Sequence, residues 1–294
     1  MKLNFATIAL LASFQSAPAS KVSDVKQLVE ASNKLQVAPP EVLPLLKYAL
    51  YVTAGAQGKK FQNCWSFSSL VKKCVLGRAN SKTTLVAIGD SHAAMWSPAL
   101  DFTARHLGMK LVLMWHPWCP QVATPKKPEC TAWKKNAYDV AKRLKPRAIF
   151  IAERTTFTTT NDDAKQWITD LQKSLLDLSN RTGTVVVLGD TPVLTQDPAS
   201  CVAANPKAVQ RCSVSRDGFP GSIPSKAKSE RIAASRVRNA VFIDPTPWLC
   251  AQRCSPIIGK MIAYSDGSHI STTYVKFLSK VMSHSVESAL SRKP

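Results

Sequence analysis

The sequence predicts a doubly wound α/β fold, in which a five-stranded parallel sheet carries helices on both faces and follows a helical extension. Two features of the 294-residue chain favour this fold. Short apolar runs typical of buried parallel strands alternate with segments of helical periodicity from residue 84 onward. Polar residues suited to chemistry directly follow several of these runs, and ligands of such sheets bind at the carboxyl ends of the strands. We therefore expect one α/β domain with a site at one edge of its sheet.

The expected strands are short apolar runs bounded by turn residues or by helical segments. They are Leu85–Ile88, Lys110–Trp115, Ala148–Ala152, Thr184–Leu188 and Ala240–Ile243. Helical patterns cover Ala93–His106, Thr131–Leu144, Asp163–Arg181, Lys226–Val237 and, at the end of the chain, Thr272–Leu290. Each strand is followed by a helix, and this order gives parallel pairing through crossover connections.

Residues 1–19 have the features of an export signal. Lys2 is followed by an apolar stretch and by the small-residue motif Ala17-Pro18-Ala19. A residual membrane anchor is the alternative. Residues 20–82 are expected to form a helical and loop-rich extension packed on the main domain, which covers residues 83–294. We therefore predict an exported protein of the periplasm, the cell envelope or the extracellular space, which a retained N-terminus would associate with a membrane.

The eight cysteines agree with export, because an even number of cysteines in an exported chain is typical of disulfides. We expect the sequential pairs, although sequence alone leaves other pairings open. These pairs are Cys64 with Cys74, Cys119 with Cys130, Cys201 with Cys212, and Cys250 with Cys254. No Cys-x-x-Cys motif occurs and no histidine has zinc-ligand spacing, so we predict no metal and no cofactor.

The net charge of +20 limits the choice of partners. Lysine and arginine are scattered along the chain, and no stripe of aromatic and basic residues suggests base stacking, so we expect no nucleic-acid partner. A basic exported domain is attracted to the anionic polymers and lipid head groups of a cell envelope. A basic surface that serves only solubility is the alternative.

Ser91 is the first candidate site residue. It follows the expected strand Leu85–Ile88 in the segment Gly89-Asp90-Ser91-His92, at the start of the next helix. A serine there is exposed, and neighbouring backbone N–H groups can stabilise an oxyanion. The sequence therefore indicates a nucleophile, and a serine that only caps the helix is the simpler alternative.

His269 and Asp266 are the matching base and orienting carboxylate. They lie in the polar turn Asp266-Gly267-Ser268-His269, just before the last expected helix. A carboxylate three residues from an imidazole can hold its tautomer, and the imidazole can then take the proton of a serine hydroxyl. Because all three residues follow strands whose carboxyl ends share one edge, we expect them to meet. Asp266 could alternatively cap a local turn.

Four further residues lie near these strand ends. Asp90 is expected to accept backbone N–H groups at its turn. His92 either lines the pocket or only begins the helix, and Arg154 either stabilises negative charge or pairs with a neighbouring carboxylate. Asp190 follows another strand, and we interpret it as part of a turn because no partner histidine is near it in the sequence.

Two motifs of the chain resemble those of the SGNH (GDSL-like) hydrolase superfamily. They are Ile88-Gly89-Asp90-Ser91-His92-Ala93 and Asp266-Gly267-Ser268-His269-Ile270-Ser271. The chain is most similar to the periplasmic SGNH domain that is fused to bacterial membrane acyltransferase-3 proteins. The resemblance covers the sequence from residue 57 to the end, and its two end motifs are more specific than the region between them.

This resemblance implies a three-layer α/β/α flavodoxin-like fold, with Ser91 as nucleophile, His269 as base and Asp266 as its orienting carboxylate. The Ser91 N–H would help to form the oxyanion site, with Arg154 and His92 as further oxyanion or substrate contacts. Two departures from the superfamily pattern leave open which groups donate hydrogen bonds to the oxyanion. Trp118-Cys119-Pro120 stands where a glycine is usual, and Glu153-Arg154 replaces Gly-x-Asn-Asp.

The leading hypothesis is an exported serine-dependent O-acyltransferase or acyl esterase that forms an acyl-serine intermediate. Its substrate would be an acylated glycan or glycolipid of the cell envelope. We recognise no membrane acyltransferase portion in the chain, so we expect either a separate membrane acyltransferase-3 protein as the acyl donor or an esterase that acts alone. The alternative is a non-catalytic glycan-binding or envelope-binding module that retains the fold.

Overall fold

The computed structural model describes residues 21–48, 64–66, 68–117, 119–122, 128–155, 161–180, 183–216 and 223–292. The expected signal or anchor at residues 1–19, and part of the expected extension, lie outside the described residues. Among the helices that are described, none is both long and apolar enough to cross a membrane.

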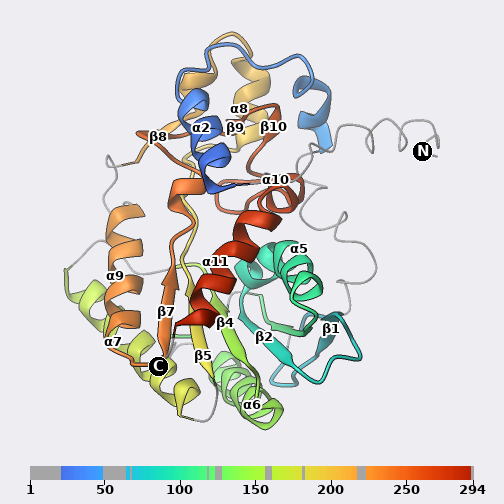
Figure 1. The fold of residues 1–294 in the computed structure, drawn as a ribbon. Helices are drawn as coiled ribbons and strands as arrows, with labels where there is room; N and C mark the ends of the chain where they lie inside the picture. The colour runs from blue at the N-terminus through green and yellow to red at the C-terminus, as the bar shows by residue number, and fades with distance from the viewer. Residues whose placement is uncertain are drawn as a thin grey trace.

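A six-stranded, mostly parallel sheet forms the centre of the fold (Figure 1). Its strand order is β1-β3-β2-β4-β5-β7. All five expected strands are present and parallel to one another: β2 (Thr84–Gly89), β3 (Lys110–Trp115), β4 (Ala148–Ala152), β5 (Thr184–Leu188) and β7 (Ala240–Ile243). The predicted doubly wound α/β class is therefore confirmed.

The expectation of five strands was one strand too few. The sixth strand, β1 (Cys74–Gly77), lies in a stretch that we expected to be loop, and it pairs antiparallel with β3 at the edge of the sheet. It has only four residues, and Val75 is 49% exposed while Leu76 is buried. A single alternation of this kind is too short to be distinguished from a loop by its pattern.

Helices cover both faces of the sheet. One face packs against α5 (Ser91–His106), α10 (Thr272–Phe277) and α11 (Ser279–Ser291). The other packs against α6 (Pro128–Leu144), α7 (Asn161–Ser179) and α9 (Ile223–Ser235). Each expected helix is found within a few residues of its predicted ends, and the single C-terminal helix is divided at Leu278.

The alternation of side chains along β2 shows how this three-layer arrangement follows from the sequence. Leu85 and Ala87 belong to the apolar cluster beneath α5 and α11, while Val86 and Ile88 belong to the cluster beneath α6, α7 and α9. Because both faces are covered, the strand is an uninterrupted apolar run and all six of its residues are buried.

The N-terminal segment packs on the C-terminal part of the chain. Helix α2 (Val22–Ser32) buries Val25 and Val29 in the main core, and a 3-10 helix follows at Leu43–Tyr48. Figure 1 shows α2 beside α8 (Pro198–Ala204) and the short strands β9 (Ile257–Ile258) and β10 (Met261–Ile262) at one end of the molecule.

Several short elements join these parts. They are a 3-10 turn at Val209–Cys212, β6 (Val214–Ser215), a 3-10 turn at Thr246–Trp248, β8 (Arg253–Cys254), β9 (Ile257–Ile258) and β10 (Met261–Ile262). Strand β6 pairs with β8, and β9 pairs with β10, each antiparallel. These elements were not predicted, because strands of two residues and single helical turns have no usable periodicity in the sequence.

Four disulfides fasten the chain, and they are the sequential pairs that the sequence predicts. Cys64 is joined to Cys74, Cys119 to Cys130, Cys201 to Cys212, and Cys250 to Cys254. The first ties the segment before β1 to that strand, and the third ties α8 to the 3-10 turn after it.

Candidate active site

The strands end together, so the residues that follow them share one edge of the sheet. Trp115, Gly89, Ala152, Leu188 and Ile243 are neighbours in register across β3, β2, β4, β5 and β7. The segments that leave these strands must therefore turn at the same edge, which is where ligands of parallel α/β sheets bind.

Ser91 is the first residue of α5 and is partly exposed. Asp90 caps this helix, because its Oδ1 accepts the backbone N–H of His92 at 2.8 Å. Asp90 also accepts the backbone N–H of Arg154 through Oδ2 at 2.9 Å, as the sequence analysis expected of a structural carboxylate. The cap therefore leaves the Ser91 hydroxyl free for other contacts.

A glycine is required immediately before this turn. A Cβ atom at Gly89 would lie 1.8 Å from the carbonyl oxygen of Ala152 and 2.8 Å from the Cβ of Ala93. Strand β4 and the first turn of α5 therefore approach the backbone at position 89 more closely than any side chain permits, and the close packing sets the position of the serine.

The turn that carries Asp266 and His269 is shaped by its own carboxylate. Asp266 Oδ1 accepts the backbone N–H groups of Ser268 and His269, each at 2.8 Å. The His269 carbonyl closes the turn by accepting the backbone N–H of Ser265 at 2.9 Å. Both interpretations of Asp266 are thus realised, because one oxygen caps the turn while the other faces the imidazole.

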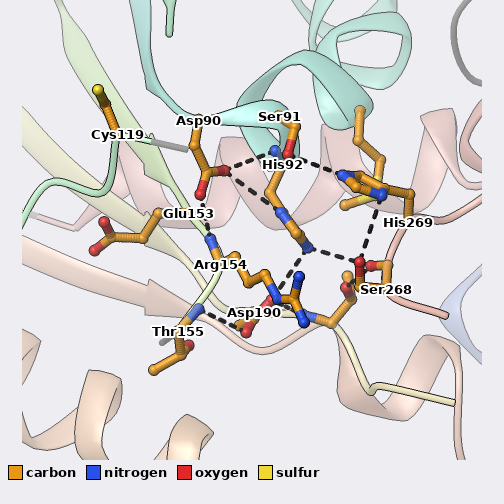
Figure 2. Close-up of polar contacts among 12 residues, drawn as sticks. Asp90, Ser91, His92, Cys119, Glu153, Arg154, Thr155, Asp190, Ser268 and His269 are labelled. Carbon is orange, nitrogen blue, oxygen red and sulfur yellow. Dashed lines mark hydrogen bonds and ion pairs between the residues drawn. The ribbon is translucent and has the colours of Figure 1, made fainter. Parts of the chain in front are cut away.

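The hydroxyl, the imidazole and the carboxylate form a continuous chain of contacts, of which Figure 2 shows the contact between Ser91 and His269. Ser91 Oγ lies 2.9 Å from His269 Nε2, and His269 Nδ1 lies 2.8 Å from Asp266 Oδ2. The side chains of His269 and Asp266 are 23% and 38% exposed, so solvent and ligands can reach the group. The structure thus brings together the three residues that the sequence analysis named for nucleophilic chemistry.

The charge on Asp266 is strongly stabilised. Its partial burial acts to raise the pKa of this carboxyl, but hydrogen bonds from the His269 ring and from the backbone N–H groups of Ser268 and His269 outweigh that effect. The pKa of Asp266 is consequently held well below its usual range, and the group is a carboxylate at neutral pH. A carboxylate can only accept, so Nδ1 of His269 carries the proton and Nε2 presents its lone pair to Ser91.

His92 does not face an open pocket. Its side chain is 2% exposed, and Figure 2 shows the ring between Asp90, Asp190 and Ser268. The centroid of its ring lies 4.8 Å from that of His269. The geometry therefore does not favour the expected contact of His92 with a substrate or an oxyanion, because protein covers the ring on all sides and a bound acyl group could not touch it.

Asp190, which the sequence indicated only as part of a turn, contacts both His92 and Thr155. It is buried at the end of β5, and its Oδ1 lies 3.4 Å from His92 Nε2. Its Oδ2 accepts the backbone N–H of Thr155 at 2.8 Å. The partner histidine exists but is nearly a hundred residues away in the sequence, so only the register of β2, β4 and β5 could have indicated the contact.

Arg154 leaves the end of β4 with its side chain exposed beside this cluster (Figure 2). Within the described part of the chain, no carboxylate lies within ion-pair distance of its guanidinium, so the alternative of a salt bridge is not realised there. The Ser91 N–H likewise meets no acceptor among the described residues. Both groups are therefore available to a negatively charged ligand atom.

Another buried carboxyl, that of Glu153, lies near the site. Glu153 is 2% exposed, and it accepts the backbone N–H of Gln121 in a short hydrogen bond. Burial raises the pKa of Glu153 to about 8, so this side chain is neutral over most of the physiological range. It follows β4 directly but faces away from the nucleophile, so we assign it to the packing of the sheet edge.

One group of side chains has the spacing of metal ligands. The ligand atoms of His116, Cys119 and Cys130 lie within 4.8 Å of one another. The two sulfur atoms are bonded to each other, so neither is a thiolate that could bind zinc. In the described residues this group therefore does not form a metal centre.

Comparison with known proteins agrees with this geometry. Residues 58–283 match the family model described as SGNH domain (fused to AT3 domains). The matched range includes the serine motif, the Asp-x-x-His motif and all six strands of the sheet. It begins within the segment that the sequence analysis assigned to the extension. No curated protein matches the chain.

Two solved structures resemble the chain. The first is the periplasmic domain of a lipopolysaccharide acetyltransferase from Salmonella ser. Paratyphi A, with 16% identity and a TM-score of 0.59 over 84% of this chain and 97% of that one. The second is a putative hydrolase from Rickettsia typhi, with 10% identity and a TM-score of 0.23 over 70% of this chain and 66% of that one. The first likeness supports the fold, and the family match supports an acyltransferase or esterase type of role. The chain belongs to the family of SGNH domains that are fused to AT3 domains.

Proposed function

We propose that this protein is an exported serine-dependent O-acyltransferase or acyl esterase that acts on glycans or glycolipids of the cell envelope. The observation that carries the proposal is the unbroken contact from Ser91 Oγ through the His269 ring to Asp266 Oδ2. A binding module has no need of a hydroxyl, an imidazole and a carboxylate in this order, whereas acyl transfer uses each of them.

The first step forms an acyl-serine. Ser91 Oγ attacks the ester carbonyl while its proton passes to His269 Nε2, and the carbonyl oxygen becomes an oxyanion. The oxyanion is stabilised by the Ser91 N–H at the start of α5 and by the positive charge of Arg154. When the tetrahedral species collapses, the bond to the leaving alcohol breaks and this alcohol takes the proton from His269.

The second step reverses the roles. An incoming hydroxyl gives its proton to His269 Nε2 and attacks the acyl-serine, and the proton then returns to Ser91 Oγ as the ester bond breaks. A sugar hydroxyl as acceptor gives transfer, and water gives hydrolysis. Asp266 stays ionised throughout and stabilises the imidazolium that forms in each step.

Several features support an envelope substrate. Four disulfides are typical of an oxidising compartment outside the cytosol. The net charge of +20 favours anionic polymers and head groups. The family is described by its fusion to AT3 domains, and we propose that a membrane acyltransferase-3 protein supplies the acyl group to this chain.

Active-site labelling tests the proposal. We expect the purified, oxidised protein to react with a fluorophosphonate probe and to hydrolyse p-nitrophenyl acetate, and we expect both signals to disappear in Ser91→Ala. Ser235→Ala is a matched control, because Ser235 is exposed at the end of α9. A folded wild-type protein that neither labels nor turns over would contradict the proposal and favour a glycan-binding or envelope-binding module.

A further inference from the structure

The ring of His92 is surrounded by hydrogen-bond acceptors. Nδ1 lies 3.4 Å from Asp90 Oδ1, and Nε2 lies 3.4 Å from Asp190 Oδ1 and 3.2 Å from the carbonyl oxygen of Ser268. A neutral imidazole has one N–H group and one unprotonated nitrogen that can only accept a hydrogen bond. In either tautomer of His92, the unprotonated nitrogen would face an oxygen atom and not a donor. Nδ1 makes no hydrogen bond at this distance, so its contact with Asp90 is one of charge, and a ring that is protonated on both nitrogens places a buried cation within ion-pair distance of both aspartates.

The charges around the ring agree. Burial acts to lower the pKa of His92, but the contact with Asp90 and the negative charges of Asp190 and Asp90 outweigh it, while Arg154 opposes them. The pKa of His92 is therefore raised above its ordinary value. The His269 ring is the remaining titratable neighbour.

Two further titratable groups, Lys226 and Glu230, contact Asp190 instead of the ring. Lys226 Nζ lies 3.7 Å from Asp190 Oδ2, and it donates a hydrogen bond to the Thr155 carbonyl at 3.0 Å. The Glu230 carboxyl is buried and accepts the backbone N–H of Asp190. Burial raises the pKa of Glu230 well above its usual value. Glu230 is thus uncharged and leaves the two aspartates as the anions that face His92.

The contact with Ser268 connects this cation to the proposed catalytic residues. The Ser268 carbonyl receives the His92 Nε2–H and also the Thr191 hydroxyl, at 2.7 Å. Ser268 directly precedes His269, and His92 directly follows Ser91. The contact between residues 92 and 268 therefore lies beside the contact between residues 91 and 269 and holds the same two segments together.

We propose that His92 is a positioning residue, whose buried and doubly protonated ring fastens the turn carrying Asp266 and His269 to the helix carrying Ser91. The proposal rests on the proposed function for its kinetic consequences. His92 touches no reacting atom in this scheme. It fixes the distance between nucleophile and base, and it places a positive charge beside the base.

The kinetic test compares His92→Gln with His284→Gln, a matched control at an exposed histidine on α11. We expect His92→Gln to lower kcat and the rate of fluorophosphonate labelling by about 10- to 100-fold with little change in KM, because small misplacements of reacting groups cost about this much. The control should match the wild type. A His92→Gln protein that labels at the wild-type rate overturns the inference, whereas an unreactive wild type overturns the proposed function instead.

Two measurements remain decisive even if His92→Gln does not fold. Histidine 15N spectra of the wild-type protein should show one buried ring that is still protonated at both nitrogens at pH values above the usual titration range of histidine. A neutral ring would overturn the inference. Thr191→Val removes the other donor to the Ser268 carbonyl and should lower kcat in the same direction but less; an unaffected kcat would contradict the role given to that carbonyl.

Discussion

Replacing Asp266 by asparagine should reverse the tautomer of His269. The direction follows from the turn, because Asp266 Oδ1 accepts the backbone N–H groups of Ser268 and His269. The amide oxygen of the substituted side chain must occupy the same place to keep those bonds, so its amide nitrogen faces His269 Nδ1. It then donates to Nδ1, the ring proton moves to Nε2, and Nε2 can no longer accept the proton of Ser91.

The expected loss in kcat is about 10⁴-fold, or about 5.5 kcal/mol of transition-state stabilisation, by analogy with the same change in serine proteases. The fold should be little affected, because the two backbone bonds survive the substitution. Hydrolysis of p-nitrophenyl acetate at pH 7 measures kcat, and thermal unfolding measures stability.

Asp266→Ala is the informative comparison. It removes the ring partner and both caps of the turn, so we expect a lower Tm in addition to the loss of activity. A kcat for Asp266→Asn within about tenfold of the wild type would refute the reasoning, because a ring with its proton on Nε2 cannot act as the base.

Two other predictions concern stability. Glu153 has a pKa of about 8 when folded, against about 4.3 when unfolded, so between these values the folded state holds a proton that the unfolded state has lost and stability falls as pH rises. Glu153→Gln cannot ionise, so the free energy of unfolding of the variant, relative to that of the wild type, should increase by about 2–4 kcal/mol as the pH rises from 5 to 8. Urea unfolding at several pH values measures this change. A difference that stays constant over the range would contradict the raised pKa of Glu153. Removing the Cys201–Cys212 disulfide by double alanine substitution should cost about 2–3 kcal/mol in the same assay and leave kcat unchanged, because this bridge closes a short loop in the apolar cluster of α8 away from Ser91. A large fall in kcat with intact stability would show that the α8 region contributes to the site.

The sequence identified the parts of the fold in which local and tertiary requirements agree. Strand β5 is a run of β-branched residues buried on both faces, and its composition alone indicates a parallel strand. Strand β1 was missed because its four residues are held in the sheet by pairing with β3 and by the bond from Cys74 to Cys64, neither of which leaves a local pattern. Fold elements that depend on distant partners are those that periodicity cannot show.

The candidate site also has residues that could be predicted from the sequence and residues that could not. Ser91 and the pair Asp266 and His269 could be named because each stands in a short motif beside a recognisable element. The contact between His92 and Asp190 could not, because it depends on the order of β2, β4 and β5 in the sheet. The residues proposed to perform the reaction left a local signal, whereas the residues that position them did not.

Asp90 and Asp190 are buried at the sheet edge for the same structural reason. Strand β4 lies between β2 and β5, and the chain that leaves β4 carries backbone N–H groups that no strand can satisfy. Asp90, at the end of β2, accepts the N–H of Arg154, and Asp190, at the end of β5, accepts the N–H of Thr155. A cation near two buried carboxylates stabilises both, and Lys226 and the proposed His92 imidazolium lie within ion-pair distance of Asp190, while His92 alone of the two also lies beside Asp90. The charge that we propose for His92 therefore agrees with the way the sheet edge is closed, and the ring that would carry it lies beside His269.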